Sequence, residues 1–378
     1  MNISTLFKEF TSSEKNSGGI LIACSIISLI VANTGWGENY IHFWHSLVAG
    51  KAIEFWINDG LMTIFFLLVG LEIEREFYIG ELSDFRKALL PVLAAVGGML
   101  VPAFIHLAFN YGKAGSDGFG IPMATDIAFS LAILALLGDK VPVTLKVFLT
   151  ALAIIDDLGA IMVIAIFYTT GFSIYYFAAA VGVFGLMLVL NRLKFHFVPV
   201  YLVLGIALWY LLYSSGIHAT ISGVLLAFAL PFGKGDEQSP SYRLQHRLHL
   251  PVAFFIVPLF ALANTAIAVD PSLVSQIFSA NSIGIILGLV IGKPFGIFVF
   301  SIVAISLGWC SLPENSTKQQ LLWTGMLAGI GFTMSIFITL MAFDEPVLTG
   351  SSKLAIIIAS TLAAAIGYFG LKRACRHV

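Results

Sequence analysis

The sequence predicts an all-α polytopic membrane protein with twelve transmembrane helices. Hydrophobic residues make up 58% of the 378 residues and charged residues only 11%, whereas about 25% of the residues in soluble domains are charged. Apolar runs long enough to cross a bilayer recur along the whole chain. The net charge is −1 and no basic tract is present, so nothing indicates nucleic-acid binding. Three scattered cysteines indicate neither a disulfide framework nor a metal site.

Hydropathy divides the chain into twelve candidate spans. In order, they cover residues 18–34, 57–72, 88–108, 121–138, 143–168, 174–191, 198–213, 216–231, 251–268, 282–307, 320–342 and 353–371. With both termini in the cytoplasm, sixteen of the 20 Lys and Arg residues fall on the cytoplasmic side. Only Lys51, Lys113 and Lys353 fall outside, as the positive-inside rule requires.

Charged residues inside the predicted spans mark the functional centre. Asp156 and Asp157 are adjacent in an apolar run, where each central Asp costs roughly 2.5–3.5 kcal/mol on insertion scales. Counted from Lys146 and from the start of the tenth span, Asp156 and Lys293 both lie roughly 15–16 Å deep at ~1.5 Å per residue. This shared depth, near the middle of a ~30 Å hydrocarbon core, predicts that the two residues pair. The alternative, a lysine that snorkels to the surface, would need a longer stem.

Two other predicted spans contain helix-breaking residues. The fourth opens on glycines and Pro122 before Asp126, and the eleventh contains several glycines before Thr333. A helix broken at depth is tolerated where it lines a cavity or is buried in protein, although close packing through small residues is the alternative. Because these spans are seven apart, they cross the membrane in opposite directions. If approximately 88–168 and 282–371 are repeats of each other, the repeat is therefore inverted.

The motifs ATDIAFS (124–130), IIDDLGA (154–160) and GKP (292–294) surround these charged residues. They are accompanied by NDGLM (58–62) with GLE (70–72), SGIHAT (215–220) and AGIGFTM (328–334). Together these motifs resemble the NhaA-type bacterial sodium/proton antiporter family along nearly the full length of the chain. Members of that family are known examples of inverted-repeat transporters, so this part of the architecture comes from the resemblance.

The resemblance implies two broken helices that cross, within a single transmembrane antiporter domain over 1–378. It also implies export of Na⁺ (and Li⁺) across the bacterial inner membrane in exchange for entering H⁺, electrogenic and regulated by pH. Such a protein is a secondary transporter, not an enzyme, and needs no cofactor; its partners are the ions and the lipid bilayer. Elementary chemistry agrees, because hard cations prefer oxygen ligands and adjacent carboxylates in a dry site take up either protons or a cation. With alternating access, that competition gives obligatory exchange.

The resemblance also assigns roles at the centre. Asp157 is the main ligand of Na⁺ or Li⁺, and Asp156 is a proton-carrying partner bridged to Lys293, with coupled titrations. Asp126 and Lys293 offset the partial charges where half-helix ends meet. Thr125 supplies a hydroxyl or a carbonyl near the ion, or is instead a back-bonded helix threonine.

For the response to pH, the resemblance implies the cytoplasmic residues Glu72, Arg75, Glu76, His246 and His249. The first three share one helical face, and a solvated helix end with minor salt bridges is the alternative. Histidine titrates near neutral pH, although loop histidines are usually bystanders. Gln245 stands where better-known members of the family carry a glutamate, so the midpoint or the steepness of the pH response can differ.

Other residues are expected to support the fold. Asp59 lies near the outer end of the second span, and Thr333 lies at a depth similar to that of Asp126. His218 is expected to pack or hydrogen-bond rather than bind a metal. Residues 42–57 lie outside, and Val-Ala-Gly-Lys within them can turn a β-hairpin. The resemblance implies that this hairpin joins two protomers, in a region completed by spans around 174–268. An interfacial aromatic belt is the alternative.

Two other functions are compatible with part of the pattern. A sodium-coupled importer of an organic solute would need a roomy polar crevice, and the intramembrane lysine beside paired aspartates favours ion-only exchange. An intramembrane aspartyl protease also needs two membrane aspartates, but Asp156 and Lys293 have no place in its shared-proton dyad. The Gly-x-Gly-Asp sequence of such proteases occurs at 233–236, in a polar loop. ATP-driven transport is not indicated, since no G-x-x-x-x-G-K-[ST] motif is present.

Overall fold

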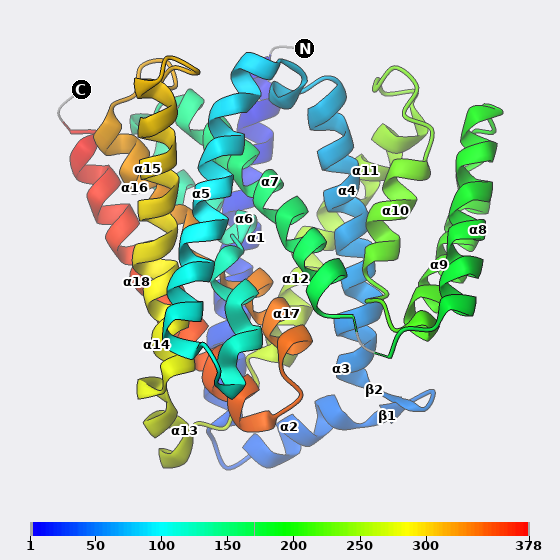
Figure 1. The fold of residues 1–378 in the computed structure, drawn as a ribbon, viewed down its shortest axis with the longest axis horizontal. Helices are drawn as coiled ribbons and strands as arrows, with labels where there is room; N and C mark the ends of the chain where they lie inside the picture. The colour runs from blue at the N-terminus through cyan, green and yellow to red at the C-terminus, as the bar shows by residue number, and fades with distance from the viewer. Residues whose placement is uncertain (1–2, 170, 377–378) are drawn as a thin grey trace. The chain divides into compact units, whose positions relative to one another are not determined.

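The computed structural model describes residues 3–169 and 171–376, and it is helical apart from one two-stranded hairpin (Figure 1). The all-α prediction is therefore confirmed. The chain divides into two compact units. Unit 1 comprises the chain up to Glu38, Asp84–Ala160 and the chain from Asn264 onward, and unit 2 comprises Asn39–Ser83 and Ile161–Ala263.

Unit 1 contains both predicted broken spans and most of the long helices. Its elements are α1 (Ile3–Ala32), α5 (Phe85–Asn110), η3 (Ala114–Met123), α6 (Ile127–Ala135), η4 (Gly138–Lys140), α7 (Val143–Phe167, up to Ala160), α13 (Pro271–Ser275), η6 (Gln276–Phe278), α14 (Ala280–Leu287), η7 (Gly288–Gly292), α15 (Lys293–Ser306), α16 (Lys318–Ala328), α17 (Phe332–Ala342) and α18 (Pro346–Ala374). Here η3 is a 3₁₀ segment and η7 is a π-helical segment. Single π turns inside α-helices are frequent at functional sites, and η7 ends immediately before Lys293.

Helices α5 and α15 pack side by side along the unit (Figure 1). Glycine makes this approach possible, because a Cβ on Gly97 would collide with the Gly296 carbonyl and a Cβ on Gly296 would collide with the Gly97 carbonyl. A Cβ on Gly98 would lie within 4 Å of the Lys293 stem. The same helix contact therefore fixes the backbone that carries Lys293.

The two broken spans have matching shapes. Segment η3 and helix α6 meet at an angle of 43° across a three-residue break, Ala124–Asp126. Helices α16 and α17 meet at 46° across a break of the same length, Gly329–Gly331. Gly329 and Gly331 thus lie within the second break, whereas Pro122 lies within η3, two residues before the first break.

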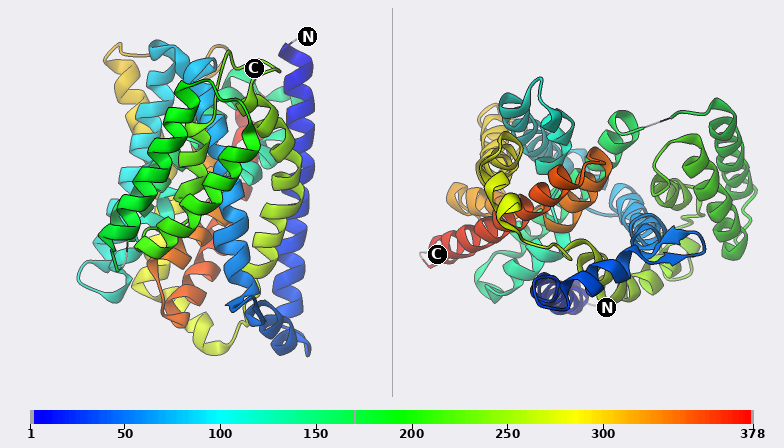
Figure 2. Two further views of the ribbon diagram at one scale, coloured as in Figure 1. Left: turned by 90° about the vertical axis from the view of Figure 1, so that its right-hand side faces the viewer. Right: turned by 90° about the horizontal axis from the view of Figure 1, so that it is seen from below.

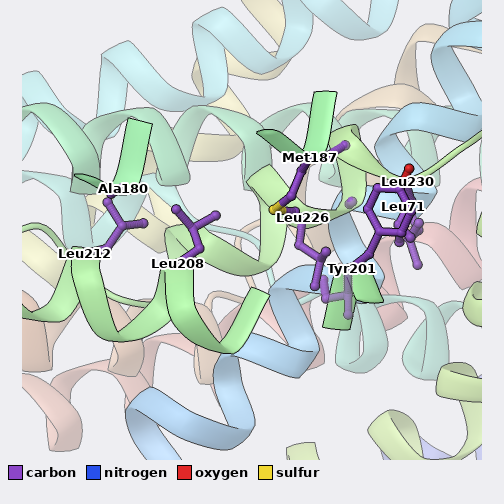
Figure 3. Packing of buried hydrophobic residues seen from close by; sticks show 11 residues of the cluster. Leu71, Ala180, Met187, Tyr201, Leu208, Leu212, Leu226 and Leu230 are labelled. Atoms are coloured by element: carbon purple, nitrogen blue, oxygen red, sulfur yellow. The ribbon is translucent and has the colours of Figure 1, made fainter. Parts of the chain in front are cut away.

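Unit 2 is built from shorter helices around an apolar cluster. Its elements are α2 (Gly37–His45), β1 (Leu47–Val48), β2 (Lys51–Ala52), α3 (Ile53–Phe55), η1 (Trp56–Leu61), α4 (Met62–Tyr78), η2 (Glu81–Ser83), the end of α7, α8 (Ile174–Arg192), α9 (Val198–Ser215), α10 (Ile221–Ala229), α11 (Pro240–Pro251), η5 (Val252–Ile256) and α12 (Val257–Asn264). Helices α8 and α9 run side by side (Figure 2). Figure 3 shows Met187, Tyr201, Leu208 and Leu226 packed between α8, α9 and α10. Because lipid tails are as apolar as these side chains, packing between membrane-spanning helices stabilises the unit through van der Waals contact rather than through transfer from water.

The predicted hairpin is present. Strands β1 and β2 are antiparallel, with Leu47 opposite Ala52 and Val48 opposite Lys51. Ala49 and Gly50 form the turn with φ of 50° and 80°, the left-handed values that a two-residue type I′ hairpin requires. Trp56 Nε1 donates to the Val48 carbonyl at 2.9 Å, which ties the hairpin to the start of the next helix.

Eight helices among the described residues are long and apolar enough to cross a membrane, and three bent pairs raise the number to eleven. The expected eighth span, 216–231, contains only α10, which has nine residues. At ~1.5 Å per residue, α10 is too short to cross the hydrocarbon core unaided. The structure therefore bears out a polytopic helical protein, while twelve spans stay a prediction.

Candidate ion-binding site

Asp156 and Lys293 form a buried ion pair in unit 1. Lys293 Nζ lies 2.7 Å from Asp156 Oδ2, and both side chains are fully inaccessible to solvent. The two residues come from α7 and from the first position of α15, which are far apart in the sequence. The depth count predicted this pairing. Charges buried this deeply are tolerated only when they are paired and hydrogen-bonded.

Asp157 follows on the same helix and is also buried. Its carboxylate acts electrostatically on the Lys293 ammonium, as Asp156 does at closer range. Consecutive positions on an α-helix point about 100° apart, so the two carboxylates present their oxygens in different directions. Within the described part of the chain, Asp156 Oδ1 accepts no hydrogen bond. That oxygen is thus a candidate ligand for a cation, since hard cations bind carboxylate oxygens.

Thr125 lies in the first break rather than inside a helix. Its Oγ1 is 2.6 Å from Asp156 Oδ2 and 2.9 Å from the carbonyl oxygen of Ala328, the last residue of α16. The hydroxyl has one proton and two acceptors, so it donates to one of them at a time. Thr125 is therefore not back-bonded, and it connects the carboxylate pair to the second broken span.

Asp126 joins the starts of the two half-helices that follow the breaks. Its Oδ1 accepts a hydrogen bond from the Phe129 backbone N–H at 2.9 Å, as the N-cap of α6. Its Oδ2 accepts from the backbone N–H and the hydroxyl of Thr333 at 3.0 and 2.6 Å, in the first turn of α17. One carboxylate thus satisfies amide donors of two helix N-termini, where negative charge is favourable.

Lys293 has a matching contact at a helix end of the opposite polarity. In addition to the ion pair, its ammonium donates to the carbonyl oxygen of Met123, the last residue of η3. Carbonyl groups at a helix end carry partial negative charge and lack partners in their own helix. The geometry therefore agrees with the dipole compensation expected of Asp126 and Lys293.

The described residues contain no group of three or more His, Cys, Asp or Glu side chains that could hold a metal ion. The oxygen-rich centre is instead two carboxylates, one threonine hydroxyl and backbone carbonyls. Such a set suits a weakly held alkali cation that enters and leaves better than a resident transition metal, which prefers nitrogen and sulfur ligands.

The family of proteins described as Na+/H+ antiporter 1 matches residues 8–371. The chain is 57% identical over 372 residues to a protein of Flavobacterium psychrophilum named Na(+)/H(+) antiporter NhaA, covering 98% of this chain and 97% of that one. A protein of the same name from Cytophaga hutchinsonii is 55% identical, with 98% and 96% covered. Another from Dechloromonas aromatica is 54% identical over 374 residues, also with 98% and 96% covered.

The chain belongs to the NhaA-type Na⁺/H⁺ antiporter family. Members of this family are multi-pass membrane proteins and secondary transporters, so this antiporter is not an enzyme and uses no cofactor. Sodium ions and protons are its substrates. An aspartyl protease is thereby excluded. Consistently, Asp236 of the Gly-x-Gly-Asp sequence accepts a 2.9 Å hydrogen bond from the Ser239 hydroxyl, which lowers the pKa of this exposed loop carboxylate.

The residues expected to respond to pH lie in unit 2. The Arg75 guanidinium lies over the Tyr242 ring, 5.1 Å from its centre, and the His246 ring stacks parallel to the same tyrosine. Glu76 Oε2 accepts a hydrogen bond from the Glu81 backbone N–H at 3.0 Å. Tyr242 was missed in the sequence, although it is four residues before His246 on α11, a spacing that places two side chains next to each other on a helix.

The other two residues expected to respond to pH lie on the same two helices of unit 2. Glu72 and His249 lie on α4 and α11, the helices that carry Arg75 and His246. Glu74, on the same helix as Glu72, is a buried carboxylate whose Oε2 has no hydrogen-bond partner among the described residues. A sequence signal existed for Glu74, because Glu-Ile-Glu places consecutive carboxylates on different faces of α4.

The residues expected to support the fold form local contacts in unit 2. The backbone carbonyl of Asp59 accepts from Trp209 Nε1 at 3.3 Å and from the Thr63 hydroxyl at 2.5 Å. His218 Nε2 lies 2.8 Å from the Tyr168 carbonyl oxygen, so this ring hydrogen-bonds to backbone.

Proposed function

We propose that the protein exports Na⁺, and Li⁺ as well, in exchange for entering H⁺ across the bacterial inner membrane, by alternating access. The observation that carries the proposal is the fully buried Asp156–Lys293 pair beside Asp157, at the point where two spans are broken. Cation and protons compete for the two carboxylates, so the protein cannot load both at once. Exchange at unequal stoichiometry moves net charge, and the membrane potential then contributes ~2.3 kcal/mol per charge per 100 mV.

Within this proposal the two aspartates differ. Asp157 is the main ligand of the cation. Asp156 carries a proton and is held by Lys293 and Thr125, so its occupancy depends on whether Lys293 keeps its ion pair. The Thr125 hydroxyl supports this assignment, because it already reaches a carboxylate oxygen at 2.6 Å. The two carboxylates titrate as a pair.

The proposed membrane architecture has twelve passes with both termini in the cytoplasm. Helix α10 and the turn before it form the eighth pass, and the two bent spans cross within inverted repeats over approximately 88–168 and 282–371. The nearly equal bends of 43° and 46° support that repeat. The whole chain acts as one antiporter domain, and two chains associate through the hairpin region 42–57 together with spans around 174–268.

Regulation by pH is proposed to act through Glu72, Arg75, Glu76, His246 and His249. The Arg75–Tyr242–His246 stack supports this assignment, because it brings two of these residues onto one aromatic ring. Gln245 removes one acidic partner from this group, so the steepness or midpoint of the response differs from that of relatives that carry a glutamate.

The function is tested in everted membrane vesicles with a pH-sensitive dye. Addition of Na⁺ or Li⁺ should dissipate an acid-inside gradient in wild type and should have no effect with Asp157→Asn. The matched control is Asp236→Asn, the same change on an exposed loop, which should keep full exchange. Full exchange by Asp157→Asn would refute the site assignment, and a wild type that moves no protons with either cation would refute the function.

A further inference from the structure

Two buried serines connect the broken spans of unit 1 reciprocally. The Ser130 hydroxyl, on α6, donates to the carbonyl oxygen of Leu327 near the end of α16 at 2.9 Å. The Ser335 hydroxyl, on α17, donates to the carbonyl oxygen of Ile121 near the end of η3 at 2.7 Å. Both serines are fully buried. Each broken span therefore supplies one hydroxyl donor to the other span and accepts one in return.

The two serines occupy equivalent places. Ser130 is the fourth residue of α6 and Ser335 is the fourth residue of α17. The Ser130 backbone N–H donates to the Asp126 carbonyl at 2.9 Å, and the Ser335 backbone N–H donates to the Gly331 carbonyl at 2.8 Å. Each acceptor is the residue immediately before the helix. With breaks of equal length and nearly equal bends, these bonds are two copies of one arrangement.

We propose that Ser130 and Ser335 are positioning residues of the cation site. Their two hydrogen bonds, here called the serine clasp, hold the broken spans at the separation at which Thr125 and Asp126 reach their partners. This inference rests on the proposed function of the Asp156–Asp157 centre and adds two residues that touch neither carboxylate.

Every clasp bond is adjacent to a group that holds the site. Leu327 precedes Ala328, whose carbonyl faces the Thr125 hydroxyl. Ser335 lies two residues after Thr333, which binds Asp126, and Ile121 lies two residues before Met123, which accepts from Lys293. A change in the clasp therefore reaches Thr125, Asp126 and Lys293 through one or two peptide units.

Loss of the Ser130 bond leaves its acceptor carbonyl with another hydrogen-bond partner. The Leu327 carbonyl also accepts the Ile330 backbone N–H at 3.1 Å, so it keeps a partner when the Ser130 hydroxyl is removed. A buried carbonyl that retains one hydrogen bond escapes the full penalty of an unsatisfied group. Removal of the hydroxyl should thus alter the separation of the spans more than the stability of the protein.

The experiment measures exchange rate against Na⁺ concentration at fixed pH in vesicles containing wild type, Ser130→Ala, Ser335→Ala or Thr324→Val. Thr324 is the matched control, because its buried hydroxyl bonds within its own helix α16, to the Gln320 carbonyl at 2.8 Å. Each variant loses one buried hydroxyl. Thermal unfolding and the amount of protein in the vesicles are recorded for all four.

The half-saturating Na⁺ concentration should rise about 2- to 10-fold with either serine variant, at a little-changed maximal rate per protein, since a hydrogen bond contributes about 0.5–1.5 kcal/mol. Thr324→Val should keep the wild-type value. If Ser130→Ala fails to accumulate, Ser130→Cys retains a weaker donor and should show a smaller rise in the half-saturating Na⁺ concentration. An unchanged half-saturating concentration, with only less folded protein, would overturn the proposal. Absence of exchange in wild type and in Thr324→Val would instead refute the function.

Discussion

Asp126 offers the sharpest test of how the broken spans are held. It accepts from the Phe129 N–H in α6 and from the N–H and hydroxyl of Thr333 in α17. Replacement of an N-cap residue by alanine costs about 0.5–2 kcal/mol, and a neutral hydrogen bond contributes about 1 kcal/mol. Asp126→Ala removes two caps and the Thr333 hydroxyl bond together. We therefore expect it to lower the free energy of unfolding by about 2–5 kcal/mol.

Two matched variants separate these contributions. Asp126→Asn keeps one oxygen as an acceptor but turns an NH₂ group toward the other set of donors. It should therefore lower the free energy of unfolding by about half as much as Asp126→Ala does. Thr333→Val deletes only the hydroxyl bond and should cost about 1 kcal/mol. Reversible unfolding in detergent micelles, followed by circular dichroism, measures all three. If Asp126→Ala costs no more than Thr333→Val, the double capping described here is wrong.

Three further outcomes follow from contacts elsewhere. Lys293→Met leaves Asp156 buried without its cation and should lower the free energy of unfolding by about 3–5 kcal/mol. Addition of Asp156→Asn to the same chain should restore much of this loss. Equal losses in the single and double variants would contradict the pairing. Gly50→Val places a β-branched residue at the φ of 80° in the hairpin turn. It should lower the fraction of dimer measured by light scattering while exchange continues. An unchanged fraction of dimer would argue against the hairpin as the element that joins two chains. The Asp270 carboxylate caps α13 by accepting a hydrogen bond from the Leu273 N–H, which lowers the pKa of Asp270. The cap is therefore intact above the pKa of the unfolded chain. It is lost as the pH falls through the lower pKa of the folded protein, below about pH 4. Amide protection at Leu273 should therefore fall in acid for wild type but not for Asp270→Asn.

The sequence predicted features that depend on a few adjacent residues or on the number of residues along a helix. Val-Ala-Gly-Lys predicted the hairpin, because a two-residue turn at positive φ depends only on the residues in it. Residue counting placed Asp156 and Lys293 at one depth, because helix rise is constant. Helix-breaking residues likewise indicated that both spans are interrupted, at Gly329–Gly331 directly and at Ala124–Asp126 through Pro122 just before it.

Features that depend on contacts between distant segments could not be predicted in this way. A buried serine or threonine bonds as readily to its own helix as to another, so Thr125, Ser130 and Ser335 gave no sequence signal of their cross-span bonds. The contact of Arg75 with the Tyr242 ring likewise depends on the packing of α4 against α11. The short helix α10 was predicted as a full span, since a run of apolar residues has the same hydropathy whether or not its first turn is helical.

The close contact between α5 and α15 also limits how this protein can change over evolutionary time. A side chain at Gly97 collides with the backbone of Gly296, and a side chain at Gly296 collides with the backbone of Gly97. Peptide backbone cannot be trimmed by substitution, so neither change has a compensating partner on the opposite helix. In an ordinary core, a larger side chain at one position can be offset by a smaller one at the position it contacts. Gly97 and Gly296 should not allow such a paired change. We therefore expect substitutions near Lys293 to be tolerated only at residues that point away from this contact.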